Sequence, residues 1–189
     1  MTGGIVKVNP AAAVRRPGYS ASEGKTPILT GNEPRRLLDA IKTDSLIGLR
    51  ERAFIGLLLY TACRVNAAVS LKVEDFYSQG ASWFLRLREK GGERHVMPRN
   101  HHLQEYLRGH IEAAGIAKDG KGPLLRTLRR RKGAKEISRT PLSQGNVYEP
   151  IQRRKKDAGI NSKIGCHSMR EPRSRICRSG IESLSERVK

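Results

Sequence analysis

Four residues in three stretches of the chain have side chains that could act together on an anion: Arg64, Lys90, His167 and Arg170. Arg64 follows residues 54–59, a strongly apolar stretch that is typical of a buried helix. A cation at the end of a buried helix is costly unless it meets an anion. Arg64 therefore pairs within the protein, or complements the dipole of the preceding helix, or binds an external anion such as phosphate.

The overall charge favours the external anion. The chain of 189 residues has 37 Lys and Arg against 18 Asp and Glu, a net charge of +19. Such an excess is the electrostatic footprint of a protein that binds a polyanion, and nucleic acid is the first candidate. A membrane is the weaker candidate, because no apolar run approaches the length of a transmembrane helix. The length suits one domain, and a hydrophobic content of 37% can build a core.

Two runs of basic residues are candidates for contact with DNA phosphates. They are Arg129, Arg130, Arg131 and Lys132, and Arg153, Arg154, Lys155 and Lys156. The alternative for such a run is a solvated surface without a partner. On a chain with so large a positive charge, contact with phosphate carries the same weight as a solvated surface.

Neither a disulfide framework nor a metal site is predicted. The three cysteines form no Cys-x-x-Cys pair, which favours a reducing, cytoplasmic setting. His101, His102 and His110 fall close together, but no acidic or cysteine partner has the spacing of a metal ligand. We expect a solvated histidine face, and no cofactor, metal or small-molecule substrate.

The expected elements give a fold of the α+β class that is mostly helical, with a small β-hairpin at one edge. One helix is predicted to start at a capping box of Thr30 and Glu33, and the next to be capped within residues 43–45. Alternation at residues 83–88, a Lys-Gly-Gly turn and residues 94–98 predict the hairpin. A further helix is expected between Asn100 and Gly115.

The remaining segments carry weaker signals. Residues 1–25 hold glycines and prolines without sustained periodicity, so a linker is expected. Residues 118–140 are basic and punctuated by glycine, and a loop is expected there. Ser143 is expected to cap a helix that ends at Gly159, and Pro150 is expected to kink or weaken that helix.

Three motifs, in this order and spacing, resemble those of the tyrosine recombinase, or phage integrase, family. The resemblance covers roughly Pro10 to Arg170. The motif Thr61-Ala62-Cys63-Arg64 is similar to the family's Thr-Gly-x-Arg box. The stretch Glu89-Lys90-Gly91-Gly92 opens a hairpin similar to its Gly-Lys-Gly-x-Lys-x-Arg-x-Val-Pro, and His167-Ser168-Met169-Arg170 is similar to its His-x-Phe-Arg.

The resemblance implies a catalytic domain over residues 26–170 that acts on double-stranded DNA, with other recombinase subunits as further partners. It implies that Arg64 and Arg170 clamp the oxygens of a DNA phosphate, on which charge gathers in the transition state. It also implies that Lys90 acts as a general acid on the leaving 5′-oxygen and that His167 assists proton transfer. This chemistry requires no metal.

The sequence departs from the family's pattern after these motifs. All five tyrosines (Tyr19, Tyr60, Tyr77, Tyr106 and Tyr148) precede His167, so the nucleophile that the family carries beyond the box is missing. We expect a domain that is incomplete at the C-terminus and inactive alone, unless a partner chain supplies the tyrosine. Residues 171–189 lack an apolar period, and we hypothesise out-of-frame sequence after a frameshift, with a native tail as the alternative.

A second function stays open at this point. In this alternative the chain is a non-enzymatic basic nucleic-acid-binding protein. The two basic runs bind the nucleic acid, and the four-residue site plays no part. That function predicts salt-sensitive binding without sequence preference.

Overall fold

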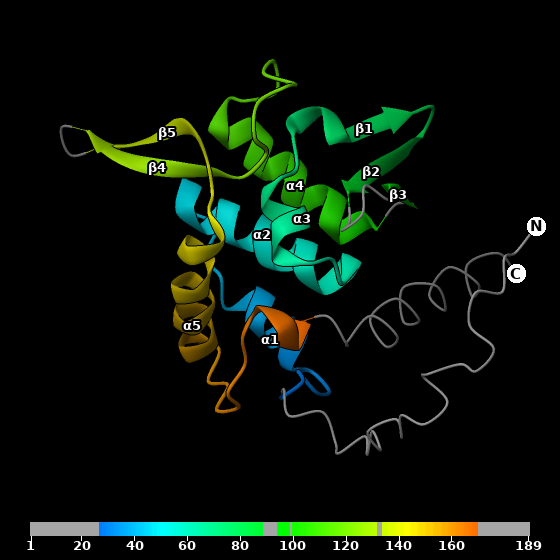
Figure 1. Cartoon of the computed structure of the whole chain (residues 1–189). Helices are drawn as coiled ribbons and strands as arrows, with labels where there is room; N and C mark the ends of the chain where they lie inside the picture. Colours follow the sequence, from blue (N-terminus) through cyan, green and yellow to red (C-terminus); the bar gives the residue numbers. More distant parts are fainter. Residues whose placement is uncertain (1–26, 89–93, 99, 132–133, 170–189) are drawn as a thin grey trace, which may run out of the picture.

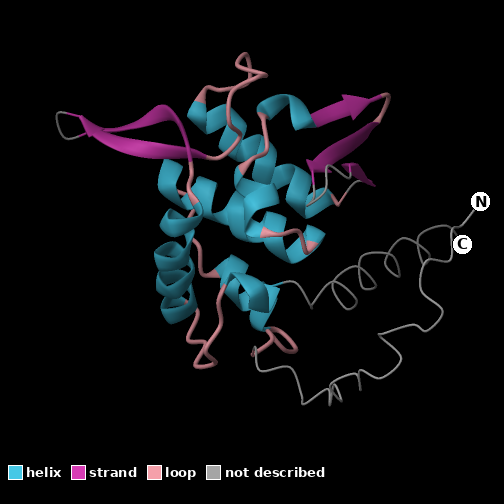
Figure 2. Ribbon diagram, in the orientation of Figure 1, coloured by secondary structure: helices cyan, strands magenta, loops and turns pink. Residues whose placement is uncertain are grey.

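The computed structural model describes residues 27–88, 94–98, 100–131 and 134–169 (Figure 1). Helices make up about half of the described chain, and short antiparallel strands and loops make up the rest (Figure 2), which confirms the α+β prediction. The α-helices are α1 (Glu33–Asp39), α2 (Leu46–Thr61), α3 (Val65–Val69), α4 (His101–Ala114) and α5 (Tyr148–Asp157). Short 3₁₀ turns are η2 (Val73–Asp75), η3 (Gln144–Val147) and η4 (Cys166–Met169). The strands are β1 (Phe76–Gln79), β2 (Ser82–Arg88), β3 (Arg94–Pro98), β4 (Arg126–Arg131) and β5 (Ala134–Pro141).

Helix α2 lies at the centre of the molecule, and the two sets of strands extend to opposite sides of it (Figure 1). Its apolar residues Phe54, Ile55, Leu57, Leu58 and Leu59 are all buried, because the helix packs against α1, α3, α4 and η4. Such burial on every side explains why the sequence there is apolar around the whole helix.

The predicted helix signals are confirmed at three points. Ser45 caps α2, where its Oγ accepts a hydrogen bond of 3.2 Å from the backbone N–H of Gly48. Asn100 caps α4 in the same way, through a 3.0 Å bond from the N–H of Leu103, and Gly115 ends α4 with a left-handed φ of 63°. The prediction for α1 is only half right: the Glu33 carboxylate accepts a 2.8 Å bond from the Thr30 N–H, but the N-cap residue is Asn32, not Thr30, and the helix begins at Glu33 itself.

Helices α2 and α4 approach each other closely at Gly56. A methyl group on Gly56 would lie only 2.8 Å from Cδ2 of Tyr106 on α4. Glycine is therefore the residue that allows this contact, which joins the two longest helices of the described chain.

The predicted hairpin is confirmed as β2 and β3, which pair antiparallel with Leu87 opposite His95. Leu85 and Leu87 of β2 are buried, and Arg86 and Arg88 point to the other face, as alternation requires. Strand β1 was not predicted from the sequence; it pairs with the other edge of β2 and completes a three-stranded sheet in the order β1-β2-β3. The hairpin tip, residues 89–93, lies outside the described residues.

The prediction of a loop over residues 118–140 is wrong for its second half, which forms the antiparallel pair β4 and β5. Leu128 pairs with Ile137, and the hydroxyls of Thr127 and Ser138 are 2.6 Å apart across the pair. The run of basic residues masked the strand pattern, because only Leu128 and Ile137 mark an apolar face in this hairpin.

The prediction that Pro150 disturbs its helix is also wrong. Residues 144–147 form the separate turn η3, and α5 begins only at Tyr148. Pro150 is thus the third residue of α5, in the first turn, where a backbone N–H has no helical partner to lose.

Candidate functional site

Arg64 is brought to the surface by a sharp turn at the end of α2. The Thr61 hydroxyl donates to the carbonyl of Leu57 (2.7 Å) and accepts from the N–H of Cys63 (3.2 Å). Ala62 between them has a left-handed backbone, with φ 52° and ψ 24°. The chain then enters α3, for which Arg64 is the exposed N-cap residue while Cys63 is buried.

His167 is presented by the turn η4, whose other side chains anchor it. Ser168 and Met169 are almost fully buried, and the Ser168 hydroxyl accepts a 3.0 Å hydrogen bond from the N–H of Gly165. Gln152 of α5 donates a 2.6 Å bond to the carbonyl of Ile164, just before this turn. The His167 side chain is left exposed, and η4 packs against α2.

Two of the four predicted site residues can thus be located in the structure. Arg64 and His167 are far apart in sequence, yet the helix that leads to Arg64 and the turn that carries His167 are in contact. Lys90 and Arg170 lie outside the described residues. Lys90 follows the end of β2 at Arg88, and Arg170 directly follows η4, so each adjoins a described element.

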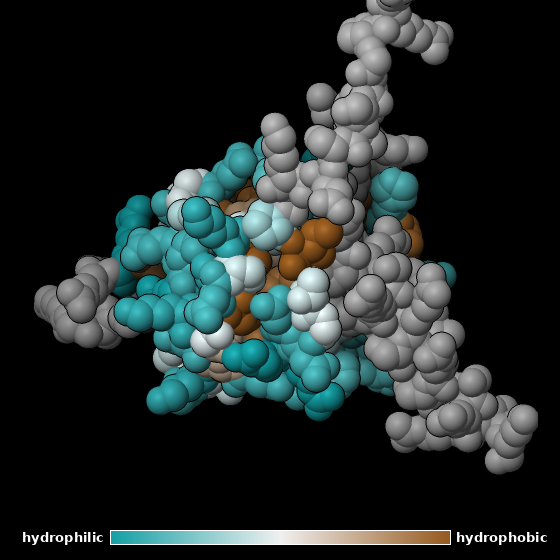
Figure 3. Space-filling view, turned by 90° about the horizontal axis from the view of Figure 1, so that it is seen from below, coloured by the Kyte–Doolittle hydropathy of each residue, from teal (hydrophilic) through white to brown (hydrophobic). Residues whose placement is uncertain are grey.

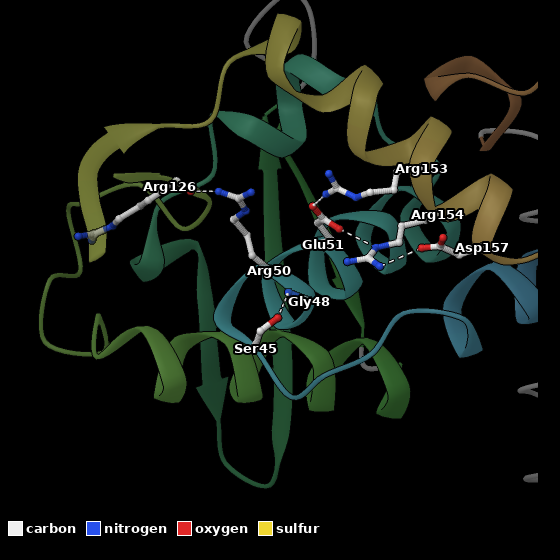
Figure 4. Close-up of polar contacts among 8 residues, drawn as sticks. All are labelled: Ser45, Gly48, Arg50, Glu51, Arg126, Arg153, Arg154 and Asp157. Carbon is white, nitrogen blue, oxygen red and sulfur yellow. Dashed lines mark hydrogen bonds and ion pairs between the residues drawn. The ribbon is translucent and has the colours of Figure 1, made fainter. Parts of the chain in front are cut away.

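The basic run of α5 is divided by an internal ion-pair cluster (Figure 4). Glu51 of α2 is 3% exposed, and its carboxylate accepts hydrogen bonds from Arg153 and from Arg154 Nε, the latter at 2.7 Å. Arg154 also binds Asp157 at 3.0 Å and is only 14% exposed. Arg154 is therefore committed to holding α5 on α2, whereas Arg153 is half exposed and Lys155 and Lys156 reach solvent.

The other basic run lies along β4. Arg129 is exposed, Arg130 and Arg131 continue the strand, and Lys132 lies outside the described residues. The base of this hairpin is fixed by Arg126, which is 3% exposed and binds Asp119 at 2.7 Å. The buried Arg50 of α2 donates a 2.9 Å bond to the Arg126 carbonyl (Figure 4).

The expectation of a solvated histidine face is correct for His101 and His102 and wrong for His110. His110 is fully buried, and its Nε2 lies 3.0 Å from the carbonyl oxygen of Leu124. It shares a face of α4 with Leu107 and Leu103, one and two helical turns away, which the spacing alone could have shown. Burial lowers the pKa of His110 to about 4.

In the part of the chain that the structure describes, no three His, Cys, Asp or Glu side chains are grouped so that they could hold a metal ion. No helix of this part is long and apolar enough to cross a membrane. Seen from below, much of the visible described surface is hydrophilic, with hydrophobic residues gathered near the centre of that face (Figure 3).

Solved structures with the same fold define the class of protein to which this fold belongs. The described arrangement matches XerH recombinase in a post-cleavage complex with a palindromic difH substrate, with a TM-score of 0.64 and 20% identity over 88% of this chain and 46% of that chain. It also matches a lambda integrase dimer bound to a COC' core site, with a TM-score of 0.62 and 21% identity over 93% of this chain and 60% of that one. The fold is that of the tyrosine recombinase catalytic domain.

The family follows from the sequence match. The model of the phage integrase family matches residues 27–183, and the chain belongs to that family. Tyrosine recombinase XerD of Mycobacterium tuberculosis (strain CDC 1551 / Oshkosh) is 30% identical over 176 residues, which cover 88% of this chain and 52% of XerD. Tyrosine recombinase XerH of Campylobacter jejuni is 28% identical over 158 residues, covering 81% of this chain and 42% of XerH. The chain thus spans about half the length of these relatives.

Proposed function

We propose that this chain binds double-stranded DNA as the catalytic domain of a site-specific recombinase. In the proposal, Arg64, Lys90, His167 and Arg170 surround the phosphate at which a strand is exchanged. The observation that carries it is the contact between α2 and η4 in a chain of the phage integrase family, since this contact brings together the elements that lead to Arg64 and carry His167.

The chemistry of the four residues suits a phosphodiester. Two guanidinium groups offer paired N–H donors to the non-bridging oxygens, and such donors stabilise the charge that develops there. An imidazole and an ammonium group can move protons to and from the bridging oxygens. Arg64 and His167 are both exposed, so a ligand as large as a duplex can reach them.

The two basic runs extend the proposed contact along the DNA backbone. Arg129, Arg130, Arg131 and Lys132 on the β4–β5 hairpin and Arg153, Lys155 and Lys156 on α5 are the candidates for contact with phosphates. Arg154 belongs to this set by sequence, but its bonds to Glu51 and Asp157 give it a supporting role: it positions α5.

The proposal extends to partners and location. Lambda integrase forms a dimer and a tetramer in its DNA complexes, and we propose further recombinase subunits as partners of this chain in the cytoplasm. The proposed domain boundaries are a linker over residues 1–25, a catalytic domain over residues 26–170 and an atypical tail over residues 171–189; the family match runs on to residue 183. In the proposal, the four residues bind the phosphate and polarise it for attack by a nucleophile.

The test compares Arg64→Ala with Arg108→Ala, which removes the same charge from an exposed position on α4. Fluorescence polarisation with a labelled duplex measures affinity as a function of salt. We expect Arg64→Ala to weaken binding about tenfold and to reduce the slope of log K against log[salt] by about 1, because a phosphate contact is lost. Equal and small losses in the two variants would contradict the proposal and would leave sequence-independent binding by the basic runs.

A further inference from the structure

Tyr148 is the most exposed large hydrophobic residue in the described chain, with 59% of its surface accessible. The other described tyrosines are half buried in ring contacts: Tyr60 with Tyr106 at 6.5 Å between centroids, and Tyr77 with Phe84 at 5.8 Å. A single exposed aromatic residue is common on protein surfaces, so its position decides whether it has a function.

Tyr148 lies between the two described elements of the proposed phosphate site. It directly follows η3, which packs against α3, the helix that Arg64 caps. On its other side, a methyl group on Gly165 would lie 4.0 Å from Cε2 of the Tyr148 ring. Cε2 adjoins the carbon that bears the hydroxyl, so the phenol end of the ring lies beside the turn that presents His167.

We infer that Tyr148 is a further DNA-binding residue of this site, whose hydroxyl donates a hydrogen bond to the phosphate bound by Arg64 and His167. The inference rests on the proposed function and adds a neutral donor to its charged groups. Tyrosine hydroxyls are common partners of DNA phosphates, and the rigid ring loses little side-chain entropy on binding. Because the hydroxyl carries no charge, its contact adds affinity without releasing counterions.

The salt dependence of DNA affinity distinguishes a neutral contact from a charged one, and the test measures it. Affinity for a labelled DNA duplex is measured over a range of salt for the wild type, Tyr148→Phe, Arg64→Ala and the double variant. Tyr148→Phe keeps the ring and removes only the hydroxyl, so the fold is preserved, as thermal melting would verify. Tyr77→Phe is the matched control, because Tyr77 stacks on Phe84 and lies on β1, on the opposite side of the molecule from α5 (Figure 1).

Tyr148→Phe is expected to bind about threefold to tenfold more weakly with an unchanged salt slope, the effect of losing one hydrogen bond. Arg64→Ala is expected to reduce the slope, and Tyr77→Phe to bind as the wild type does. If both residues hold one phosphate, the loss in the double variant is smaller than the product of the single losses.

The outcomes separate this inference from the function on which it rests. Wild-type affinity of Tyr148→Phe beside weak binding by Arg64→Ala overturns the role of Tyr148 alone. Independent, multiplying losses also overturn it, because the hydroxyl then contacts a different part of the DNA. Wild-type behaviour of Arg64→Ala overturns the proposed function itself.

Discussion

Ala62 occupies a backbone conformation that suits glycine, at the turn that exposes Arg64. It is the only non-glycine residue with positive φ in the described chain, and the family motif that the sequence resembles has glycine there. A left-handed backbone costs an L-residue about 1 kcal/mol or more, whereas glycine adopts it freely. We predict that Ala62→Gly raises the free energy of unfolding by about 1 kcal/mol, measured by urea denaturation.

The control is the same substitution on an ordinary helix. Ala113 is an exposed residue of α4, where glycine is a poor helix former, so Ala113→Gly should lower the free energy of unfolding by about 1 kcal/mol. If Ala62→Gly and Ala113→Gly changed the free energy of unfolding in the same direction, the left-handed backbone of Ala62 would not be costing stability.

At the level of single residues, the sequence indicated which side chains to inspect but not how they are paired. The order and type of Arg64 and His167 predicted a common site; the structure shows contact between α2, which leads to Arg64, and η4, which carries His167. The loss of Arg154 from the basic surface could not be predicted, because its partner Glu51 lies 103 positions away. Glu51 itself gave no signal, since a buried acid on an apolar helix cannot be told from an exposed one by its neighbours in sequence.

His110 joins two elements, α4 and the segment before β4, and makes their association depend on pH. Burial holds its pKa at about 4, below the usual 6.5, so the folded protein keeps the imidazole neutral. Above pH 6.5 the imidazole of His110 is neutral in both the folded and the unfolded protein. As the pH falls from 6.5 to 4, it takes up a proton only in the unfolded protein. We predict a loss of about 3 kcal/mol of stability over that range from this group.

The measurement is urea denaturation of the wild type and His110→Gln at several values between pH 7 and pH 4. Gln can still donate to the Leu124 carbonyl but does not titrate, so the variant should lose less stability as the pH falls. The same pH dependence in both proteins would show that the imidazole is not responsible.

Elements with strong local signals were predicted well, and those set by tertiary context were not. Caps at Ser45 and Asn100 and the alternation in β2 are local, and each predicted an element that the structure contains. Strand β1 has only four residues and exists because it pairs with β2. The β4–β5 hairpin is so basic that its apolar side is reduced to a single cross-strand pair, which no periodicity analysis of the sequence would detect.

At the scale of the whole molecule, the 37 Lys and Arg residues behind the net charge of +19 do not all face solvent, because some are buried or paired inside the fold. Glu51 and Asp119 are used to hold Arg153, Arg154 and Arg126 against the core. Other described basic residues lie on the β4–β5 hairpin, on α5 and at Arg64, and further ones lie on α1, β2 and α4. Net charge predicted a polyanion as ligand, but only the fold separates the cations that support the structure from those that can meet DNA.

The central claim is that Arg64 and His167 bind one phosphate of a DNA duplex. The most direct measurement is the structure of the chain bound to a duplex, selected from a random-sequence pool by its affinity for the protein. The account predicts one phosphate with oxygens about 3 Å from both the Arg64 guanidinium and the His167 imidazole. A duplex bound only to the β4–β5 hairpin and α5, with Arg64 away from every phosphate, would contradict it.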